Sequence, residues 1–273
     1  MSLLLHLGSA LLAASSEPAR LQYQGSRLML GGEPIAVGGP LLVNADGQVF
    51  SNADGSLKPS GKPATISGTD GLGAFSEVRD SWAAGSTKLE TAVRTYDDCL
   101  VFELHWPEGA SCTGGSGAAG VVAGWPSLQL ANAAERGFLA IGGRQLEDCF
   151  AAGLDQLSQL PTGDGGGGPV AVFARNGSTV VLSAASEFMS SAWAKVARGN
   201  TTLTAGTLGT VTSLPPGFRS LTIAMSAAGP TAGVVAVGRT LQKLYGKNAT
   251  ASRESYVTTH APSHNLIYQV IMD

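Results

Sequence analysis

Two segments of alternating polarity, joined by a pair of aspartates, constrain the fold of this chain more than any other feature. Asp97 and Asp98 are residues expected at a tight turn, and Pro107 closes the second segment because it cannot donate a ladder hydrogen bond. One face of the two segments carries Leu89, Thr91, Val93 and Thr95 before the turn and Leu100, Phe102, Leu104 and Trp106 after it. A period of two is typical of half-buried antiparallel strands. Residues 89–107 therefore predict a β-hairpin.

Composition favours strands and turns over helices. Only 14% of the 273 residues are charged and 37 are glycine, whereas globular domains average about 25% charged residues and about 7% glycine. The net charge of −3 gives no electrostatic reason to expect nucleic acid as a partner. Because no run of eighteen apolar residues occurs, we predict no membrane span.

The rest of the chain repeats short strand patterns with turn residues about every ten positions. Asp46-Gly47 is the strongest short hairpin signal. The glycine-rich residues 163–169 precede a strand and not a helix, so they predict a loop and not a phosphate-binding site. Residues 230–245 begin with proline, repeat valine and leucine at helical spacing, and are followed by glycine. Ten or more strands and one helix predict a mainly β fold, a large antiparallel β-sandwich with one C-terminal helix.

The start of the chain leaves two interpretations open. Residues 1–14 resemble the apolar part of a signal peptide but lack the positive residues that precede one. The alternative is a buried first strand or a disordered start. Three sequons, at Asn176, Asn200 and Asn248, are candidate N-glycosylation sites and would fit a secretory route.

The three cysteines, Cys99, Cys112 and Cys149, are too far apart in sequence for a Cys-x-x-Cys metal or redox motif. Cys99 and Cys112 could form a disulfide in an oxidising compartment. The alternative interpretation is that the cysteines are small buried hydrophobic residues.

Few residues have a context that points to catalysis. Pro262 lies between His260 and His264 and prevents the helix that would aim both at one metal, so we expect neither a metal nor another cofactor. Asp97 and Asp98 are better explained by a turn than by a catalytic carboxylate pair. No serine lies in a nucleophile-elbow motif, and we assign no catalytic residue.

The tryptophans suggest a binding role. Trp82, Trp106 and Trp125 could stack on sugar rings, because an aromatic face packs well against C–H surfaces. The alternative is burial in the core of the sandwich. Trp106 and Trp125 each precede a proline at a predicted strand end, and we expect them to be the exposed, sugar-stacking pair.

The order of several short segments resembles the N-terminal β-sandwich of large glycoside-hydrolase-like proteins of the α-galactosidase and raffinose-synthase group. The segments are Trp82, residues 89–98, Val101-Phe-Glu103, Trp106-Pro-Glu-Gly109, Trp125-Pro-Ser127, Ile141-Gly-Gly-Arg144, residues 168–173, residues 208–218 and Tyr245-Gly-Lys247. The resemblance covers about residues 20–247. It implies a sandwich followed by a linking helix and a catalytic (β/α)8 barrel.

The resemblance ends after Lys247, where the group would continue into the first barrel strand. No catalytic residue of the group can therefore be placed on this sequence. We divide the chain into residues 1–19, a leader or disordered start; 20–228, the sandwich; 229–247, the linker helix; and 248–273, an irregular tail. The resemblance implies an accessory domain that is inert alone and partners a barrel. The alternative is a free-standing carbohydrate-binding or adhesion module.

Overall fold

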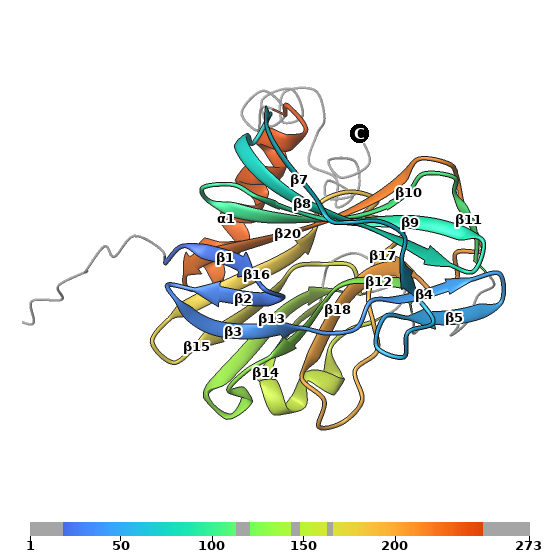
Figure 1. Cartoon of the computed structure of the whole chain (residues 1–273). Helices are drawn as coiled ribbons and strands as arrows, with labels where there is room; N and C mark the ends of the chain where they lie inside the picture. The colour runs from blue at the N-terminus through green and yellow to red at the C-terminus, as the bar shows by residue number, and fades with distance from the viewer. Residues whose placement is uncertain (1–18, 113–120, 143–147, 163–165, 248–273) are drawn as a thin grey trace, which may run out of the picture.

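The computed structural model describes residues 19–112, 121–142, 148–162 and 166–247. Two antiparallel sheets lie face to face, and Figure 1 shows the sheet with β8–β10 above the sheet with β3, β12 and β18. The fold is thus mainly β and is a β-sandwich, as the strand patterns and turn spacing predicted. Within the described part of the chain, no helix combines the length and apolarity that crossing a bilayer requires.

One sheet contains eight described strands, in the order β1-β2-β3-β12-β18-β17, with β4 paired to β12 and β5 paired to β4. These are β1 (Leu21–Gln24), β2 (Arg27–Leu30), β3 (Glu33–Gly38), β4 (Leu42–Ala45), β5 (Gln48–Ser51), β12 (Val121–Leu130), β17 (Ser191–Trp193) and β18 (Thr202–Leu208). The predicted Asp46-Gly47 turn joins β4 to β5. Both residues have positive φ, 50° and 79°, as a two-residue hairpin loop requires.

The other sheet contains ten described strands, in the order β14-β13-β15-β16-β20-β10-β9-β8-β6 with β7 on β8. These are β6 (Lys58–Pro59), β7 (Ala64–Asp70), β8 (Gly73–Ala84), β9 (Thr87–Thr95), β10 (Cys99–Trp106), β13 (Arg136–Gly142), β14 (Asp148–Gly153), β15 (Val170–Ala174), β16 (Ser178–Ala184) and β20 (Phe218–Ala228). A small ribbon pairs β11 (Ala110–Ser111) with β19 (Ser213–Leu214), and two short 3-10 helices are η2 (Ala133–Glu135) and η3 (Leu154–Gln159).

The predicted hairpin of residues 89–107 is confirmed as β9 and β10. Its register pairs Phe102 with Val93 and Leu104 with Thr91, so the apolar face inferred from the period of two is the face that enters the core. Phe102 packs with residues of both sheets, including Leu128 and Leu203. The hairpin differs from the prediction in one respect: β10 is buried on both of its faces, because other groups cover the outer side.

The helix α1 (Pro230–Leu244) confirms the predicted helix. It covers part of the outer face of the ten-stranded sheet. It packs across the outer face of the ten-stranded sheet, where Val237 joins a cluster with Val181, Val101 and Ile223. Figure 1 shows α1 beside β20, and the helix packs on β20 and β16. The rest of the outer face, over β8, β9 and β10, carries charged side chains.

Candidate functional site: an ion-pair network on the outer sheet face

Seven ionisable side chains lie together on the outer face of the ten-stranded sheet, beside the part that α1 covers. We call them the outer network. They come from four neighbouring strands: Glu77 and Arg79 from β8, Glu90 and Arg94 from β9, Glu103 and His105 from β10, and Arg219 from β20. The strand registers pair Glu77 with Arg94 and Glu90 with His105, which places an acidic side chain beside a basic one in each pair. His105 also pairs with Arg219 on its other side.

Glu103 is the centre of the outer network and is only 1% exposed. Its carboxylate accepts a hydrogen bond from Arg94 Nη2 at 2.7 Å and another from Arg219 Nη1 at 2.9 Å. Arg79 Nη2 lies 3.5 Å from the same carboxylate. A carboxylate with this burial needs such partners, because an unpaired buried charge is strongly unfavourable.

Glu77 and Glu90 complete the network through Arg79. The Arg79 guanidinium donates to Glu77 at 2.8 Å and to Glu90 at 2.7 Å, while Arg94 Nε donates to the second oxygen of Glu77 at 2.5 Å. His105 Nδ1 lies 2.9 Å from Glu90 Oε2. Each of the three glutamates therefore has at least two cationic or imidazole partners.

These contacts favour the ionised forms of Glu77 and Glu90. Burial by itself would raise the pKa of Glu77, but hydrogen bonds from Arg79 and Arg94 outweigh it and lower that pKa. The pKa of Glu90 is lowered in the same way, by His105 and Arg79 against burial. A carboxyl group with a lowered pKa is a poor proton donor near neutral pH, so neither glutamate suits the role of general acid.

A raised carboxyl pKa occurs at Asp80, where burial disfavours the charged form. Asp80 pairs in register with Thr91, and its side chain lies on the inner face of β8, opposite the outer network. Hydrolysis of a glycosidic bond needs two carboxyl groups about 5–10 Å apart across one pocket. Asp80 and the network glutamates are separated by the sheet itself, so they cannot flank a common bond.

The expectation that Trp106 is exposed is wrong, whereas Trp125 is partly exposed. Trp106 is 0% exposed and lies in the inter-sheet core with Leu104 and Val122. Trp125 packs edge-on against Phe102, with ring centroids 6.0 Å apart, and its indole nitrogen is buried. Strand β12 continues through the Trp125-Pro126 step to Leu130, so a proline after tryptophan does not mark a strand end here. The Trp106 ring therefore has no face that a sugar could reach.

The other residues singled out from the sequence lie in different parts of the structure. Asn176 and Asn200 lie in exposed turns, so glycosylation there stays a prediction. Cys99 belongs to the cluster under α1 and Cys112 to the inter-sheet core, and all three cysteines are free thiols. Asn248, His260, His264 and residues 1–14 lie outside the described residues. Among the described residues, no group of three or more candidate ligands is placed to hold a metal ion.

The outer network was not predicted from the sequence, although the hairpin carries part of the signal for it. The outward positions of the hairpin carry Glu90, Ala92 and Arg94 before the turn and Val101, Glu103 and His105 after it. Ionisable residues at four of these six positions indicate a sheet face with charged cross-strand pairs. Nothing in the sequence indicates that residues of β8 and β20 join the network, because the pattern along a strand does not show which strands lie beside it.

Comparisons with known proteins identify the fold. No protein-family profile and no curated protein matches the sequence. Among solved structures, a quadruple mutant of the α-N-acetylgalactosaminidase NagBb from Bifidobacterium bifidum is similar, with 13% identity and a TM-score of 0.50, over 85% of this chain and 38% of that one. Such a match establishes a shared fold: the sandwich is like a β-rich part of a glycoside hydrolase.

Two further solved structures are similar at lower scores. A glycoside hydrolase family 97 enzyme from Pseudoalteromonas sp. strain K8, in complex with panose, has 10% identity and a TM-score of 0.49 over 77% of this chain and 34% of that one. A β-arabinopyranosidase has 14% identity and a TM-score of 0.46 over 77% and 38%. The chain thus spans well under half the length of these enzymes.

Proposed function

We propose that this chain is a non-catalytic β-sandwich domain of a glycoside-hydrolase-like protein acting on galactosides or related oligosaccharides. The observation that carries the proposal is the pairing of every carboxylate in the outer network with a guanidinium or imidazole group. The glutamates of the outer network therefore form part of a structural layer and do not form a proton-transfer pair.

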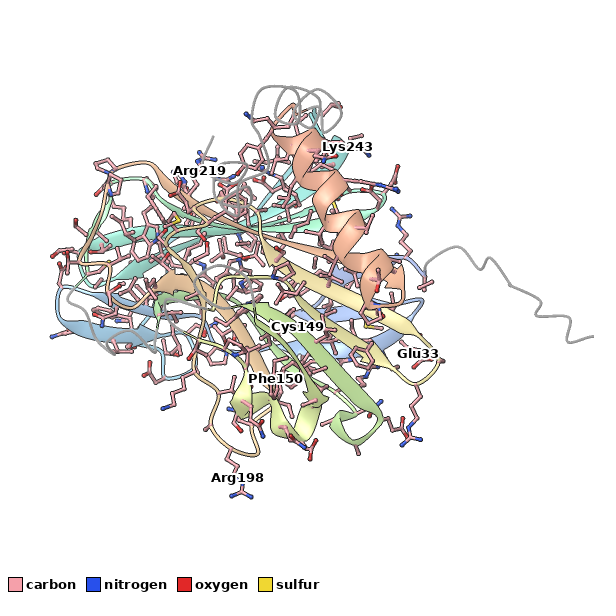
Figure 2. All side chains as sticks on the ribbon, turned by 180° about the vertical axis from the view of Figure 1, so that it is seen from behind. Glu33, Cys149, Phe150, Arg198, Arg219 and Lys243 are labelled. Carbon is pink, nitrogen blue, oxygen red and sulfur yellow. The ribbon has the colours of Figure 1, made fainter. Side chains whose placement is uncertain are left out.

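The composition of the outer face supports a partner for this domain. Helix α1 covers one part of it, and the outer network of three glutamates, three arginines and a histidine lies next to the helix, with the Arg219 side chain half exposed at 49%. Figure 2 shows Arg219 on the same side of the molecule as Lys243 in the last turn of α1. We propose that this face packs against a catalytic (β/α)8 barrel, with residues 229–247 as the linker.

The alternative function, a free-standing carbohydrate-binding module, depended on an exposed tryptophan pair. Burial of Trp106 removes the feature that favoured it. We therefore propose the accessory role alone.

Activity measurements test the proposal. Purified chain is incubated with aryl α- and β-galactosides, aryl glucosides and raffinose-type oligosaccharides, and we expect no release of aglycone or monosaccharide above buffer. Asp80→Asn and Glu77→Gln serve as matched variants, because they remove the raised-pKa acid and a network acid respectively. Release of product that either variant abolishes would show a catalytic site in this domain and overturn the proposal.

A further inference from the structure

Two aromatic rings lie exposed at the C-terminal end of α1. Tyr245 follows the last helical residue, and Phe188 belongs to the turn between β16 and β17. Their ring centroids are 6.2 Å apart, and the two residues are 46% and 48% exposed. Met189, next to Phe188 in the same turn, is 82% exposed. We call these three residues the helix-end patch.

The β16–β17 turn of this patch is held in place by hydrogen bonds. The Ser190 amide donates to the Glu187 carbonyl at 2.9 Å, which closes the turn. The Leu221 amide of β20 donates to the Ser186 hydroxyl at 2.9 Å, which ties the turn to the ten-stranded sheet. Glu187 has a φ of 52°, a conformation that residues with a side chain rarely adopt. The turn therefore presents its apolar side chains from a defined position.

Tyr245 is held to the same part of the sheet. Its hydroxyl donates to the carbonyl of Ala185 at 2.6 Å. Burial, with a contribution from Glu187, raises the pKa of Tyr245, so the phenol keeps the proton that it donates. Exposed apolar patches among polar residues mark interaction sites, and tyrosine, phenylalanine and methionine are enriched in interfaces. The helix-end patch is therefore suited to contact another apolar segment.

The sequence after Lys247 contains a segment with the composition to cover this patch. Residues 266–272 read Leu-Ile-Tyr-Gln-Val-Ile-Met, and six of the seven are apolar. No aspartate, glutamate, lysine or arginine occurs from residue 255 to residue 272. An uncharged run of β-branched and aromatic residues promotes aggregation when it is left exposed. The segment and the patch thus both gain from an apolar partner.

Their positions in the chain favour pairing within one molecule. The described residues end at Lys247, two residues after Tyr245, so residues 248–273 continue from the patch itself. Residues 248–265 number 18 and can span up to about 60 Å when extended. Because an encounter within one chain is intramolecular, even a weak contact is populated.

We propose that the apolar side chains of residues 266–272 dock on the helix-end patch of the same molecule, over Phe188, Met189 and Tyr245. The contact is independent of the proposed accessory role. Glycosidase activity of the chain would overturn that role and leave this contact intact, and failure of this contact would leave that role intact.

Disulfide trapping in the whole chain tests the proposal. Cys149→Ser first removes the exposed native thiol. Met189→Cys and Gln269→Cys then place one thiol on the patch and one in the segment, with glutathione disulfide as the oxidant and mass spectrometry as the readout. Val49→Cys with Gln269→Cys is the matched control, because Val49 is 66% exposed on β5 of the other sheet.

We expect the patch pair to form an intramolecular disulfide at least about tenfold faster than the control pair, because docking raises the local concentration of the two thiols. Equal rates for the two pairs would overturn the proposal. Disulfide-linked dimers in place of the intramolecular product would also overturn it and would assign the patch to a second copy of the chain.

Oxidation of Met189 tests the contact without introduced thiols, because peroxide converts an accessible methionine to its sulfoxide. Ile267→Asp with Val270→Asp is expected to raise the oxidation rate of Met189 severalfold over wild type, since burying a charge against an apolar surface is unfavourable. Ser255→Asp with Thr258→Asp adds the same charge outside the segment and should leave the rate unchanged. An unchanged rate in the first variant, or an equal rise in the control, would overturn the proposal.

Discussion

Gly233 of α1 lies against Val181 of β16 so closely that a methyl group at Gly233 would overlap Cγ2 of Val181. The glycine is buried in the face of the helix that packs on the sheet. This contact fixes how near the helix approaches the outer sheet face. A glycine inside a helix normally lowers helix stability by about 0.5–1 kcal/mol relative to alanine. At position 233 the absence of a side chain allows the helix to pack closely against Val181.

The first prediction concerns this contact. Gly233→Ala is expected to lower the free energy of unfolding by about 1–3 kcal/mol, because the added methyl forces the helix away from Val181. Gly238→Ala is the matched control: nothing lies within 4 Å of its added methyl, and it is exposed in the same helix. The control is expected to stabilise the protein by up to about 1 kcal/mol. Denaturant melts in which both variants are stabilised would contradict the close packing of α1.

The second prediction concerns the hairpin core. Phe102→Ala and Leu104→Ala are each expected to cost about 2–5 kcal/mol in the free energy of unfolding, because both side chains are 1% exposed and contribute to clusters between the sheets. Val49→Ala, at a residue 66% exposed, is expected to change it by less than about 0.5 kcal/mol. Equal effects of core and surface variants in urea melts would refute the observed register.

The third prediction concerns pH. The folded-state pKa of Glu77 is lowered, so its ionised form stabilises the protein above the unfolded-state value of about 4.3, and this stabilisation is lost as pH falls through the folded pKa. Glu77→Gln is expected to reduce the free energy of unfolding at pH 7 by about 1.5–3 kcal/mol, the usual value for hydrogen bonds to charged groups.

The difference between wild type and Glu77→Gln should be constant above about pH 5 and shrink below about 4.3. Urea melts from pH 3 to pH 8 measure it. Glu33→Gln is the control, because Glu33 is exposed and labelled in Figure 2 far from Arg219; it should show no such trend. A Glu77→Gln difference that grows on acidification would reverse the assigned direction of the pKa shift.

The fourth prediction concerns the thiols. Burial, with a contribution from Asp98, raises the pKa of Cys99 to about 12, and burial raises the pKa of Cys112. Cys149 is exposed on β14. We expect the native protein to react rapidly with a thiol reagent at pH 8 at one cysteine only, because the thiolate is the reactive form. Cys149→Ser should abolish this reaction. A disulfide between Cys99 and Cys112 in mass spectra would contradict their separate clusters.

The fold was largely predictable because its strongest signals are local. Alternation over residues 89–107 needs only the two-residue period of a strand, and the Asp46-Gly47 turn needs only two residues that tolerate positive φ. The helix of residues 230–244 was found from its proline, its spacing and its following glycine. Each of these features depends on contacts a few residues apart.

The candidate sites were decided by tertiary structure. Glu103 meets Arg219 across 116 residues of sequence and Glu77 meets Arg94 across 17, because β20 and β8 flank the hairpin. The alternating residue pattern indicates which face of the hairpin is charged. It does not indicate which strands lie beside the hairpin. The same reason explains the error at Trp106, which the sequence pattern placed correctly at a strand end but predicted to be exposed. Strand pairing and sheet packing bury it, and these are non-local interactions that no residue pattern along one strand can specify.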